Sequence, residues 1–221
     1  MIPLSVPNLC GNELKYVKRC IKTEWISTAG NYISLFEKKV ASYLDSKYAI
    51  ACINGTSALQ VALRISEVGN GDEVIVPTLT FIAPINSVIY NNAKPIFMDC
   101  DDFYNMDVEK TIKFIKNETV FRNNFTFNKK TKKRIPAILP VHLWGNAARL
   151  EELVKICKER NISIVEDAAE SFGTKYTNGK LKNQFTGTIG KVGCLSFNGN
   201  KIITTGGGGM ILTNNQKLAK K

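Results

Sequence analysis

The sequence predicts an α/β protein with a mostly parallel central sheet and helices on both of its faces. Short apolar runs, typical of buried strands, alternate along the chain with longer segments whose apolar residues recur at helical spacing. This alternation is the signature of successive β-α-β units around a parallel sheet. The chain has 221 residues, 44% of them hydrophobic and 22% charged, which is the composition of an ordinary globular domain.

The N-terminal part of the chain is expected to hold an extended stretch and two helices. Residues 4–12 are predicted to be extended, and Asn12 is predicted to cap a helix over residues 13–23. A second helix is predicted over residues 32–44, because apolar residues recur there on one helical face.

The remaining elements follow from the alternation. Buried strands are predicted at residues 48–53, 73–76, 95–98, 135–141, 162–165 and 192–197. Helices are predicted between them at residues 57–66, 82–90, 108–115 and 149–160. Residues 210–213 are predicted to add a strand and residues 214–221 to begin a capped helix, so we expect the chain to end inside a fold. No internal repeat interrupts the pattern, which favours a single domain over residues 1–221.

One stretch, residues 116–134, breaks this rhythm and is predicted to be an exposed hairpin insertion. It ends in a basic run formed by Lys129, Lys130, Lys132, Lys133 and Arg134. The run predicts either a solvated surface excursion, which is the commoner case, or an electropositive patch for nucleic acid or a polyphosphate. The chain has no aromatic RNA-recognition pattern and no zinc spacing, so we do not expect nucleic acid as a partner.

The charge balance and the cysteines limit the class of protein. The chain carries 30 Lys and Arg against 19 Asp and Glu, a net charge of +11, which favours anionic ligands. Its six cysteines form no C-x-x-C pair and His142 is the single histidine, so neither a disulfide framework nor a metal site is expected. The sequence shows no secretory leader and no apolar run of about 18 residues, so we expect a soluble cytoplasmic protein without a membrane partner.

The first segment that carries chemistry joins the strand at residues 48–53 to the next helix through Asn54-Gly55-Thr56-Ser57. A glycine turn at a helix N-terminus directs free backbone N–H groups, the positive end of the helix dipole and two hydroxyl groups at one point. This arrangement is an anion site suited to phosphate. The alternative is simple helix capping, since Thr and Ser are favoured there for stability alone.

The second segment is the strand at residues 162–165, which ends in Glu166 and Asp167. In open α/β sheets ligands bind outside the carboxyl ends of the strands, and neighbouring side chains of a strand point in opposite directions. We therefore expect only one of these two carboxylates to face the crevice. The alternative is a solvated acidic strand end.

The third segment follows the strand at residues 192–197 and places Lys201 between Asn198-Gly199-Asn200 and four glycines at residues 206–209. A lysine in such surroundings can have backbone and ligand close by, and it becomes an amine nucleophile when it is deprived of solvent. Most lysines, however, are only solubilising surface charges, and composition alone would not single this one out.

Taken in order, these segments resemble the pyridoxal-phosphate-dependent nucleotide-sugar aminotransferases of the DegT/DnrJ/StrS type, which have the aspartate-aminotransferase (fold type I) architecture. The resemblance covers nearly the whole chain and implies that residues 1–221 are the large, cofactor-binding domain. Seven ordered motifs carry it: Ile2-Pro3-Leu4-Ser5, Trp25-Ile26-Ser27-Thr28-Ala29-Gly30, Asn54-Gly55-Thr56-Ser57-Ala58-Leu59, Pro77-Thr78-Leu79-Thr80-Phe81, Pro140-Val141-His142-Leu143-Trp144-Gly145, Glu166-Asp167-Ala168-Ala169 and Ser196-Phe197 to Met210.

The resemblance also implies a site for pyridoxal 5′-phosphate and a role for each of its residues. Lys201 is implied to be catalytic, forming the Schiff base and moving a proton between the amino acid and the cofactor. Glu170 is implied to face the cofactor where many relatives have Gln or His, which leaves its role open. His142 is a candidate for substrate contact, with a structural hydrogen-bonding histidine as the alternative. The implied cofactor ligands are Gly55, Thr56, Ser57 and Ser196 at the phosphate, Phe81 stacked on the pyridine ring and Asp167 at the ring nitrogen.

The implied reaction is a transamination in surface polysaccharide or glycan sugar biosynthesis. Family members that remove a sugar hydroxyl carry histidine in place of Lys201, so the lysine favours amino transfer from glutamate to the C4 ketone of a nucleotide-linked 4-keto-6-deoxyhexose. The finer match favours UDP-linked sugars of legionaminic-acid-like or bacillosamine-like pathways. Relatives carry a smaller C-terminal domain and form homodimers with shared sites, so we expect this chain to be truncated. The alternatives are an inactive or partial family fragment and a basic module that binds anions or nucleic acid.

Overall fold

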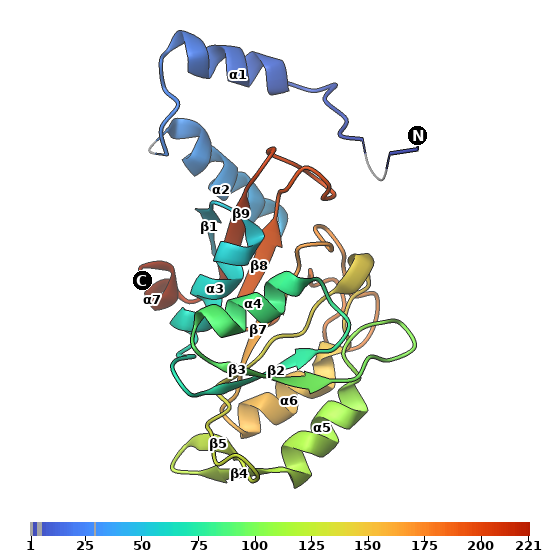
Figure 1. The fold of residues 1–221 in the computed structure, drawn as a ribbon. Helices are drawn as coiled ribbons and strands as arrows, with labels where there is room; N and C mark the ends of the chain where they lie inside the picture. The colour runs from blue at the N-terminus through green and yellow to red at the C-terminus, as the bar shows by residue number, and fades with distance from the viewer. Residues whose placement is uncertain (1, 4–5, 29) are drawn as a thin grey trace.

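The computed structural model describes residues 2–3, 6–28 and 30–221, and it shows an α/β fold built on a seven-stranded sheet (Figure 1). The strands lie in the order β1-β9-β8-β7-β6-β2-β3, and all neighbouring pairs are parallel except the two that involve β9. The predicted fold class is therefore confirmed. The strands are β1 (Tyr48–Cys52), β2 (Glu73–Pro77), β3 (Lys94–Met98), β6 (Ala137–Ile138), β7 (Ser163–Asp167), β8 (Val192–Ser196) and β9 (Gly209–Thr213).

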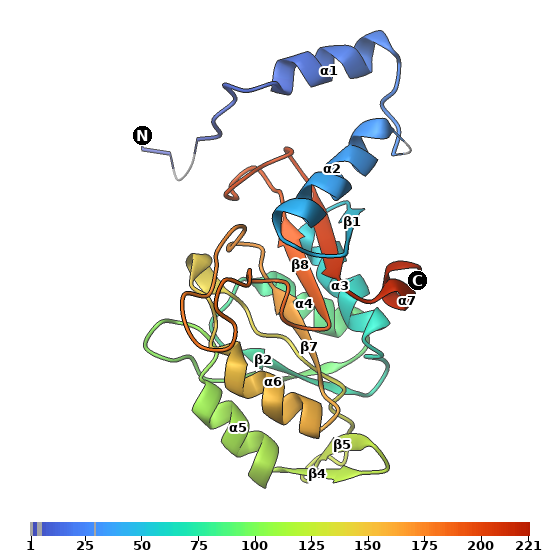
Figure 2. The same cartoon turned by 180° about the vertical axis from the view of Figure 1, so that it is seen from behind.

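Helices cover both faces of the sheet, as the two opposite views show (Figures 1 and 2). Alternate residues of β2 point to opposite faces of the sheet. Val74 and Val76 pack in the apolar cluster with α3 and α4, whereas Ile75 packs in the cluster with α5 and α6. The helix α2 packs beside β1 over a third apolar cluster. These helices are α2 (Asn31–Tyr43), α3 (Gly55–Ile65), α4 (Ile82–Tyr90), α5 (Val108–Asn117) and α6 (Leu150–Glu159).

Within residues 116–134, predicted to be an exposed hairpin insertion, the structure shows an antiparallel hairpin of β4 (Thr119–Arg122) and β5 (Phe125–Asn128), as predicted. The hairpin is not fully exposed, because Thr119, Thr126 and Asn128 are buried. The hairpin lies at the opposite end of the molecule from the loop that joins β8 to β9 (Figures 1 and 2). The basic run at residues 129–134 follows β5, and two of its side chains bond other parts of the fold. Arg134 forms an ion pair with Asp72 at 2.7 Å. The Nζ of Lys129 donates a hydrogen bond to the carbonyl oxygen of Asn117 at 2.6 Å.

The element boundaries agree with the predictions to within one or two residues, with one exception. The strand predicted over residues 135–141 is paired only at β6, with a further isolated bridge at Val141. Pro136 and Pro140 bracket this segment, and because proline has no N–H group it interrupts the ladder of hydrogen bonds. The sequence pattern predicted the burial of this segment correctly, but fewer of its residues pair with neighbouring strands than predicted.

The N-terminal helix α1 (Glu13–Lys22) lies apart from the sheet in both views (Figures 1 and 2). It has no buried residue, and its apolar stripe is open, with Leu14 and Ile21 each 65% exposed. Asn12 precedes the helix as predicted, but its side chain makes no capping hydrogen bond, so that prediction is wrong. Leu4 and Ser5, from the stretch predicted to be extended, and Ala29 lie outside the described residues.

At the C-terminal end, α7 (Gln216–Ala219) is capped by Asn215, whose side chain accepts hydrogen bonds from the N–H groups of Lys217 and Leu218. A single 3-10 turn, η1 (Leu143–Gly145), lies between β6 and α6. No helix in the described part of the chain is long and apolar enough to cross a membrane.

Candidate active site

A cavity of about 370 Å³ opens where the carboxyl ends of β7 and β8 meet the N-terminal ends of α3 and α4. This is the position at which parallel α/β sheets bind ligands. Segments far apart in the sequence contribute to its walls. The lining residues are Asn54, Gly55, Thr56, Leu59, Thr80, Phe81, Ala83, Val141, Leu143, Asp167, Ala169, Glu170, Ser196, Asn198, Asn200 and Lys201.

The first turn of α3 presents free N–H groups to this cavity. Asn54 caps the helix, because its side chain accepts a hydrogen bond from the Ser57 N–H at 2.8 Å. The N–H groups of Gly55 and Thr56 have no acceptor among the residues that the structure describes. They lie at the positive end of the helix dipole, where an anion is stabilised.

Gly55 allows α3 to approach β8 closely. A Cβ atom on Gly55 would lie 2.9 Å from the Cβ of Ser196, closer than two such carbons can pack. The hydroxyl group of Ser196 therefore lies beside the start of α3. Of the residues predicted to share a phosphate site, Gly55, Thr56 and Ser196 are brought together in the cavity wall. Ser57 does not line the cavity, and its N–H is already bonded by the helix cap.

Asp167 is the carboxylate that faces the cavity, as expected for one member of the acidic pair. It is 5% exposed, and it accepts one hydrogen bond, from the Ala169 N–H at 3.0 Å. Burial raises the pKa of Asp167 to about 6. A buried carboxylate with one N–H donor and no ion pair in the described chain can pair with a protonated nitrogen of a ligand.

Glu166 points to the other side of β7 and is fully buried. Its carboxylate accepts the N–H groups of Gly187, Ile189 and Gly190 at 2.8, 2.7 and 2.5 Å, and it lies 2.9 Å from Nε2 of His142. It therefore ties the loop before β8 to the end of β7.

His142 does not line the cavity, and its ring has no exposed surface. Nδ1 accepts the Ala148 N–H at 3.0 Å, which assigns the ring proton to Nε2, facing Glu166. Both ring nitrogens are thus taken up by protein partners. His142 is therefore a structural hydrogen-bonding residue, which was the alternative to substrate contact. The geometry does not support contact between His142 and a substrate.

Lys201 and Glu170 form an ion pair inside the cavity, with Nζ 3.1 Å from Oε1. The second oxygen of Glu170 accepts the Trp144 N–H at 2.9 Å. The Lys201 Nζ lies 6.0 Å from the centre of the Phe81 ring, which is 69% exposed at the start of α4. Glu170, whose role the sequence left open, therefore holds the amine of Lys201 beside an open aromatic ring.

Sequence reasoning missed Thr80 as a cavity residue. Its hydroxyl oxygen is buried and has no hydrogen-bond partner among the described residues. The signal was present, because Thr80 directly precedes Phe81 in the quoted Thr-Leu-Thr-Phe motif. Buried polar atoms are normally paired, so an unpaired one in a cavity wall indicates a ligand site.

Together these groups fit a phosphorylated pyridine ring. Free N–H groups and hydroxyls can bind a phosphate, and Asp167 can bind a protonated ring nitrogen. Phe81 offers an aromatic face, and Lys201 is the single amine among the described residues that line the cavity.

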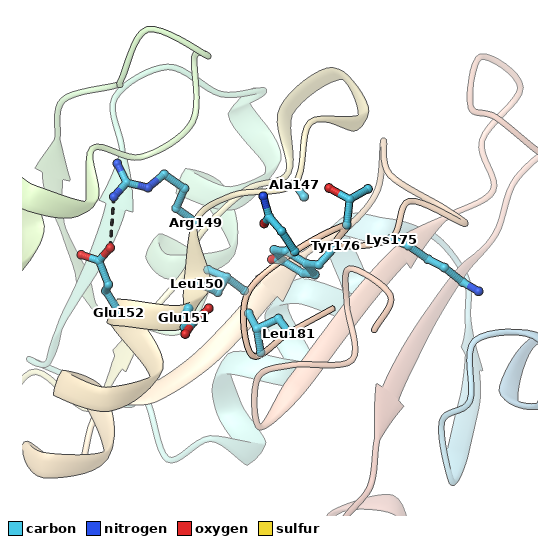
Figure 3. Close-up of a pocket in the computed structure, with 10 residues that line it drawn as sticks. Ala147, Arg149, Leu150, Glu151, Glu152, Lys175, Tyr176 and Leu181 are labelled. Atoms are coloured by element: carbon cyan, nitrogen blue, oxygen red, sulfur yellow. Dashed lines mark hydrogen bonds and ion pairs between the residues drawn. The ribbon is translucent and has the colours of Figure 1, made fainter. Parts of the chain in front are cut away.

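A second pocket, of about 480 Å³, lies at the start of α6 and has a different character (Figure 3). Arg149 bonds Glu152 at 3.1 Å, as the dashed line marks, and it also pairs with Glu109 at 2.7 Å. The Tyr176 hydroxyl donates to the Ala148 carbonyl oxygen at 2.8 Å. Because these polar groups are already paired, the smaller cavity around Lys201 is the candidate active site.

Comparison with known proteins gives a family match along almost the whole chain. The model of the DegT/DnrJ/EryC1/StrS aminotransferase family matches residues 7–221. The GDP-perosamine synthase of Escherichia coli O157:H7 is 42% identical over 217 residues, which cover 98% of this chain and 54% of that protein. The GDP-perosamine synthase of Caulobacter vibrioides is 42% identical over 221 residues, which cover 100% of this chain and 54% of that protein.

Solved structures give the same match in three dimensions. An aminotransferase from Psychrobacter cryohalolentis superposes with a TM-score of 0.82 at 35% identity, covering 98% of this chain and 51% of that chain. An E. coli GDP-4-keto-6-deoxy-D-mannose-3-dehydratase with bound hydrated PLP superposes with a TM-score of 0.83 at 25% identity. The match covers 99% of this chain and 52% of that chain. The fold is thus that of fold type I enzymes, as predicted, and the chain spans about half the length of these relatives.

Proposed function

The chain belongs to the DegT/DnrJ/EryC1/StrS aminotransferase family, and from this premise we propose that it forms the cofactor-binding large domain of a pyridoxal-phosphate-dependent sugar aminotransferase. The observation that carries the proposal is the meeting of Lys201, Asp167 and the free N–H groups of α3 in one cavity. When bound, pyridoxal 5′-phosphate would supply a carbonyl carbon that takes the amino group from one substrate and gives it to the other, and a ring that accepts electrons during the transfer.

The proposed binding residues follow from the geometry of the cavity. The N–H groups of Gly55 and Thr56, with the hydroxyls of Thr56 and Ser196, bind the phosphate. Phe81 packs against the ring, and the Asp167 carboxylate accepts a hydrogen bond from the protonated ring nitrogen. The protonated ring nitrogen would be a cationic partner for the buried Asp167 carboxylate, which has no ion pair among the described residues.

Lys201 is the proposed catalytic residue. Its amine both binds the cofactor and carries a proton to and from the reacting carbon, which requires that it stay inside the cavity between steps. Glu170 meets this requirement, because its carboxylate holds Nζ at 3.1 Å and is itself fixed by the Trp144 N–H. We therefore assign Glu170 a positioning role.

We propose glutamate as the amino donor and a nucleotide-linked 4-keto-6-deoxyhexose as the acceptor. The sequence motifs favoured UDP as the nucleotide. The relatives at 42% identity are named GDP-perosamine synthases, so a GDP-linked sugar is now the first acceptor to test. UDP remains the alternative, because a relative at 35% identity from Acidithiobacillus ferrooxidans is named as an aminotransferase of a UDP-linked sugar.

We also propose that the protein acts as a homodimer. Two exposed apolar surfaces support this: the open stripe of α1, and a groove of about 630 Å³ whose walls include Tyr16, Tyr32, Leu35 and Ile53. Contiguous exposed apolar surface is typical of protein interfaces. Two of the five cations in the basic run that follows β5, Lys129 and Arg134, bond groups within the fold.

The proposal is tested by mixing the purified protein with pyridoxal phosphate and recording absorbance. We expect a visible band that changes on addition of glutamate and recovers on addition of a GDP-linked 4-keto-6-deoxyhexose. Lys201→Ala is expected to bind pyridoxal phosphate without this band, whereas the matched surface variant Lys155→Ala is expected to behave as wild type. A protein that gives no band under any of these conditions would refute the proposal.

A further inference from the structure

We propose that Trp144 and Tyr104 form an aromatic wall at the mouth of the cavity, against which the hexose ring of the keto-sugar substrate packs. The inference rests on the proposed function and goes beyond it, since it assigns the sugar ring a binding surface of its own.

The first observation is the backbone conformation of the two residues. Trp144 has φ +52° and Tyr104 has φ +67°, and they are the two aromatic residues with positive φ in the described chain. Bulky side chains avoid this left-handed region, which asparagine, aspartate and glycine tolerate. The two strained aromatic residues also contact each other, with ring centres 5.3 Å apart at an angle of 66°. Strain of this kind persists where a site requires it.

The second observation is that the protein fixes the two loops to each other and leaves the rings open. The buried Asn105 accepts the Leu143 N–H at 3.1 Å and donates to the Asn146 carbonyl oxygen at 3.4 Å, so it bridges the loop of Tyr104 and the loop of Trp144. The ring-bearing residues stay exposed, Trp144 at 64% and Tyr104 at 50%. A rigid support below an exposed aromatic pair is an arrangement suited to stacking.

The third observation places the backbone of Trp144 close to the reacting amine. Trp144 N–H bonds one oxygen of Glu170 at 2.9 Å, and Lys201 Nζ bonds the other at 3.1 Å. A single carboxylate therefore separates the amine from the backbone of Trp144, whose ring lies outside the cavity lining. The part of a substrate that can reach both is the ring that carries the reacting ketone. The nucleobase lies farther away, beyond a diphosphate.

The chemistry of a hexose suits this surface. The C–H groups of a sugar ring form an apolar face that packs on aromatic rings, while its hydroxyl groups remain free to bond polar side chains. Asn198 and Asn200 line the same cavity and can supply such bonds. Glutamate has no ring, so the wall has no function when the amino donor is bound.

The test separates the two half-reactions of the transamination. In Trp144→Asn the ring is removed, asparagine tolerates the left-handed backbone, and the N–H that holds Glu170 is retained. We expect glutamate to consume the visible band at a rate within about twofold of wild type. We expect KM for a GDP-linked 4-keto-6-deoxyhexose to rise by about tenfold, the size of one lost aromatic contact, and Trp144→Phe to restore most of it.

The control is Phe121→Asn, which removes an exposed aromatic ring from the distant β4–β5 hairpin and is expected to leave both half-reactions unchanged. Equal loss in both half-reactions of Trp144→Asn would overturn the inference, because Trp144 would then act through Glu170 alone. An unchanged KM would overturn it as well. So would an equal loss of inhibition by GDP, which would assign the ring to the nucleobase. A wild-type protein inert toward both substrates would refute the proposed function, and the inference with it.

Discussion

Glu166 and Asp167 are neighbours on β7 whose carboxylates lie on opposite sides of the strand and have opposite surroundings. Glu166 accepts three backbone N–H groups and faces Nε2 of His142, whereas Asp167 accepts a single N–H. One carboxylate is saturated with hydrogen bonds and the other is left free for a ligand. The alternation of a strand thus separates an acid that bonds the surrounding loops from an acid that faces the cavity.

The free carboxylate predicts a pH dependence of stability. Burial raises the pKa of Asp167 to about 6, above the value of about 3.9 in an unfolded chain. Between these values the folded protein holds a proton that the unfolded chain has released. The free energy of unfolding of the ligand-free protein should therefore fall as pH rises from about 4 to about 6, by about 3 kcal/mol.

This dependence is measured by urea unfolding of wild type and Asp167→Asn across that pH range. The variant should lack the Asp167 contribution, should be more stable than wild type at pH 7, and should bind pyridoxal phosphate less tightly. Asp45→Asn, an amide replacement at an exposed position, serves as the control. Parallel pH curves for wild type and Asp167→Asn would show that the carboxylate is not buried as described.

Removal of the saturated carboxylate is predicted to destabilise the fold. Glu166→Ala leaves the N–H groups of Gly187, Ile189 and Gly190 and the Nε2 of His142 without their acceptor in the interior. We expect a loss of about 3–5 kcal/mol in the free energy of unfolding, measured with denaturant. Glu159→Ala, at an exposed position on α6, should change it by less than about 0.5 kcal/mol. A small loss at Glu166 would be inconsistent with these contacts.

The unpaired hydroxyl of Thr80 predicts an unusual response to substitution. Thr80→Val removes a buried oxygen that has no partner, so the ligand-free protein should keep its stability or gain up to about 1 kcal/mol. Thr111→Val removes a buried hydroxyl that bonds the Asp107 carbonyl oxygen at 2.6 Å, and it should lose about 1 kcal/mol. Thermal unfolding without ligand compares the two variants, and equal losses would mean that Thr80 has a protein partner after all.

Gly55 is predicted to be required for the shape of the proposed phosphate site. In Gly55→Ala the new Cβ meets Ser196 at 2.9 Å, so α3 must move away from β8 and carry its free N–H groups with it. We expect the dissociation constant for pyridoxal phosphate to rise by at least about tenfold, because the loss of one charge-assisted hydrogen bond has this size. Gly207→Ala is the matched control, since a Cβ there meets nothing within 4 Å. Equilibrium dialysis gives both values, and unchanged binding by Gly55→Ala would contradict the described packing.

Much of the fold could be predicted from the sequence because burial and periodicity are local properties. The strand that ends in Asp167 and the glycine turn before α3 follow from patterns of a few residues, and the position of ligands at strand ends is a general rule. The chain order of the motifs then carried the resemblance to the family. The orientation rule for neighbouring side chains predicted that one of the two acids would face the cavity, but not which one.

The parts that could not be predicted depend on contacts between distant segments. The partners of Glu170 are Trp144 and Lys201, which lie on two other loops, so no local pattern reveals their bonds. The left-handed backbone of Tyr104 runs against the preference of its residue type, and the bonds that join its loop to the loop of Trp144 come from the side chain of Asn105. Asn12 shows the converse, since a suitable capping residue stands at the right position and makes no cap.

The place of β9 in the sheet sets the order in which the chain can fold. β1, the first strand to leave the ribosome, has β9, the last strand, as its neighbour in the sheet. β1 therefore stays unpaired until the chain has been synthesised through β9, and its pairing is the most non-local contact of the sheet. Such contacts slow folding and leave an open strand edge in the nascent chain. The strand that leads into the proposed phosphate site is thus the one whose pairing most depends on synthesis through Thr213.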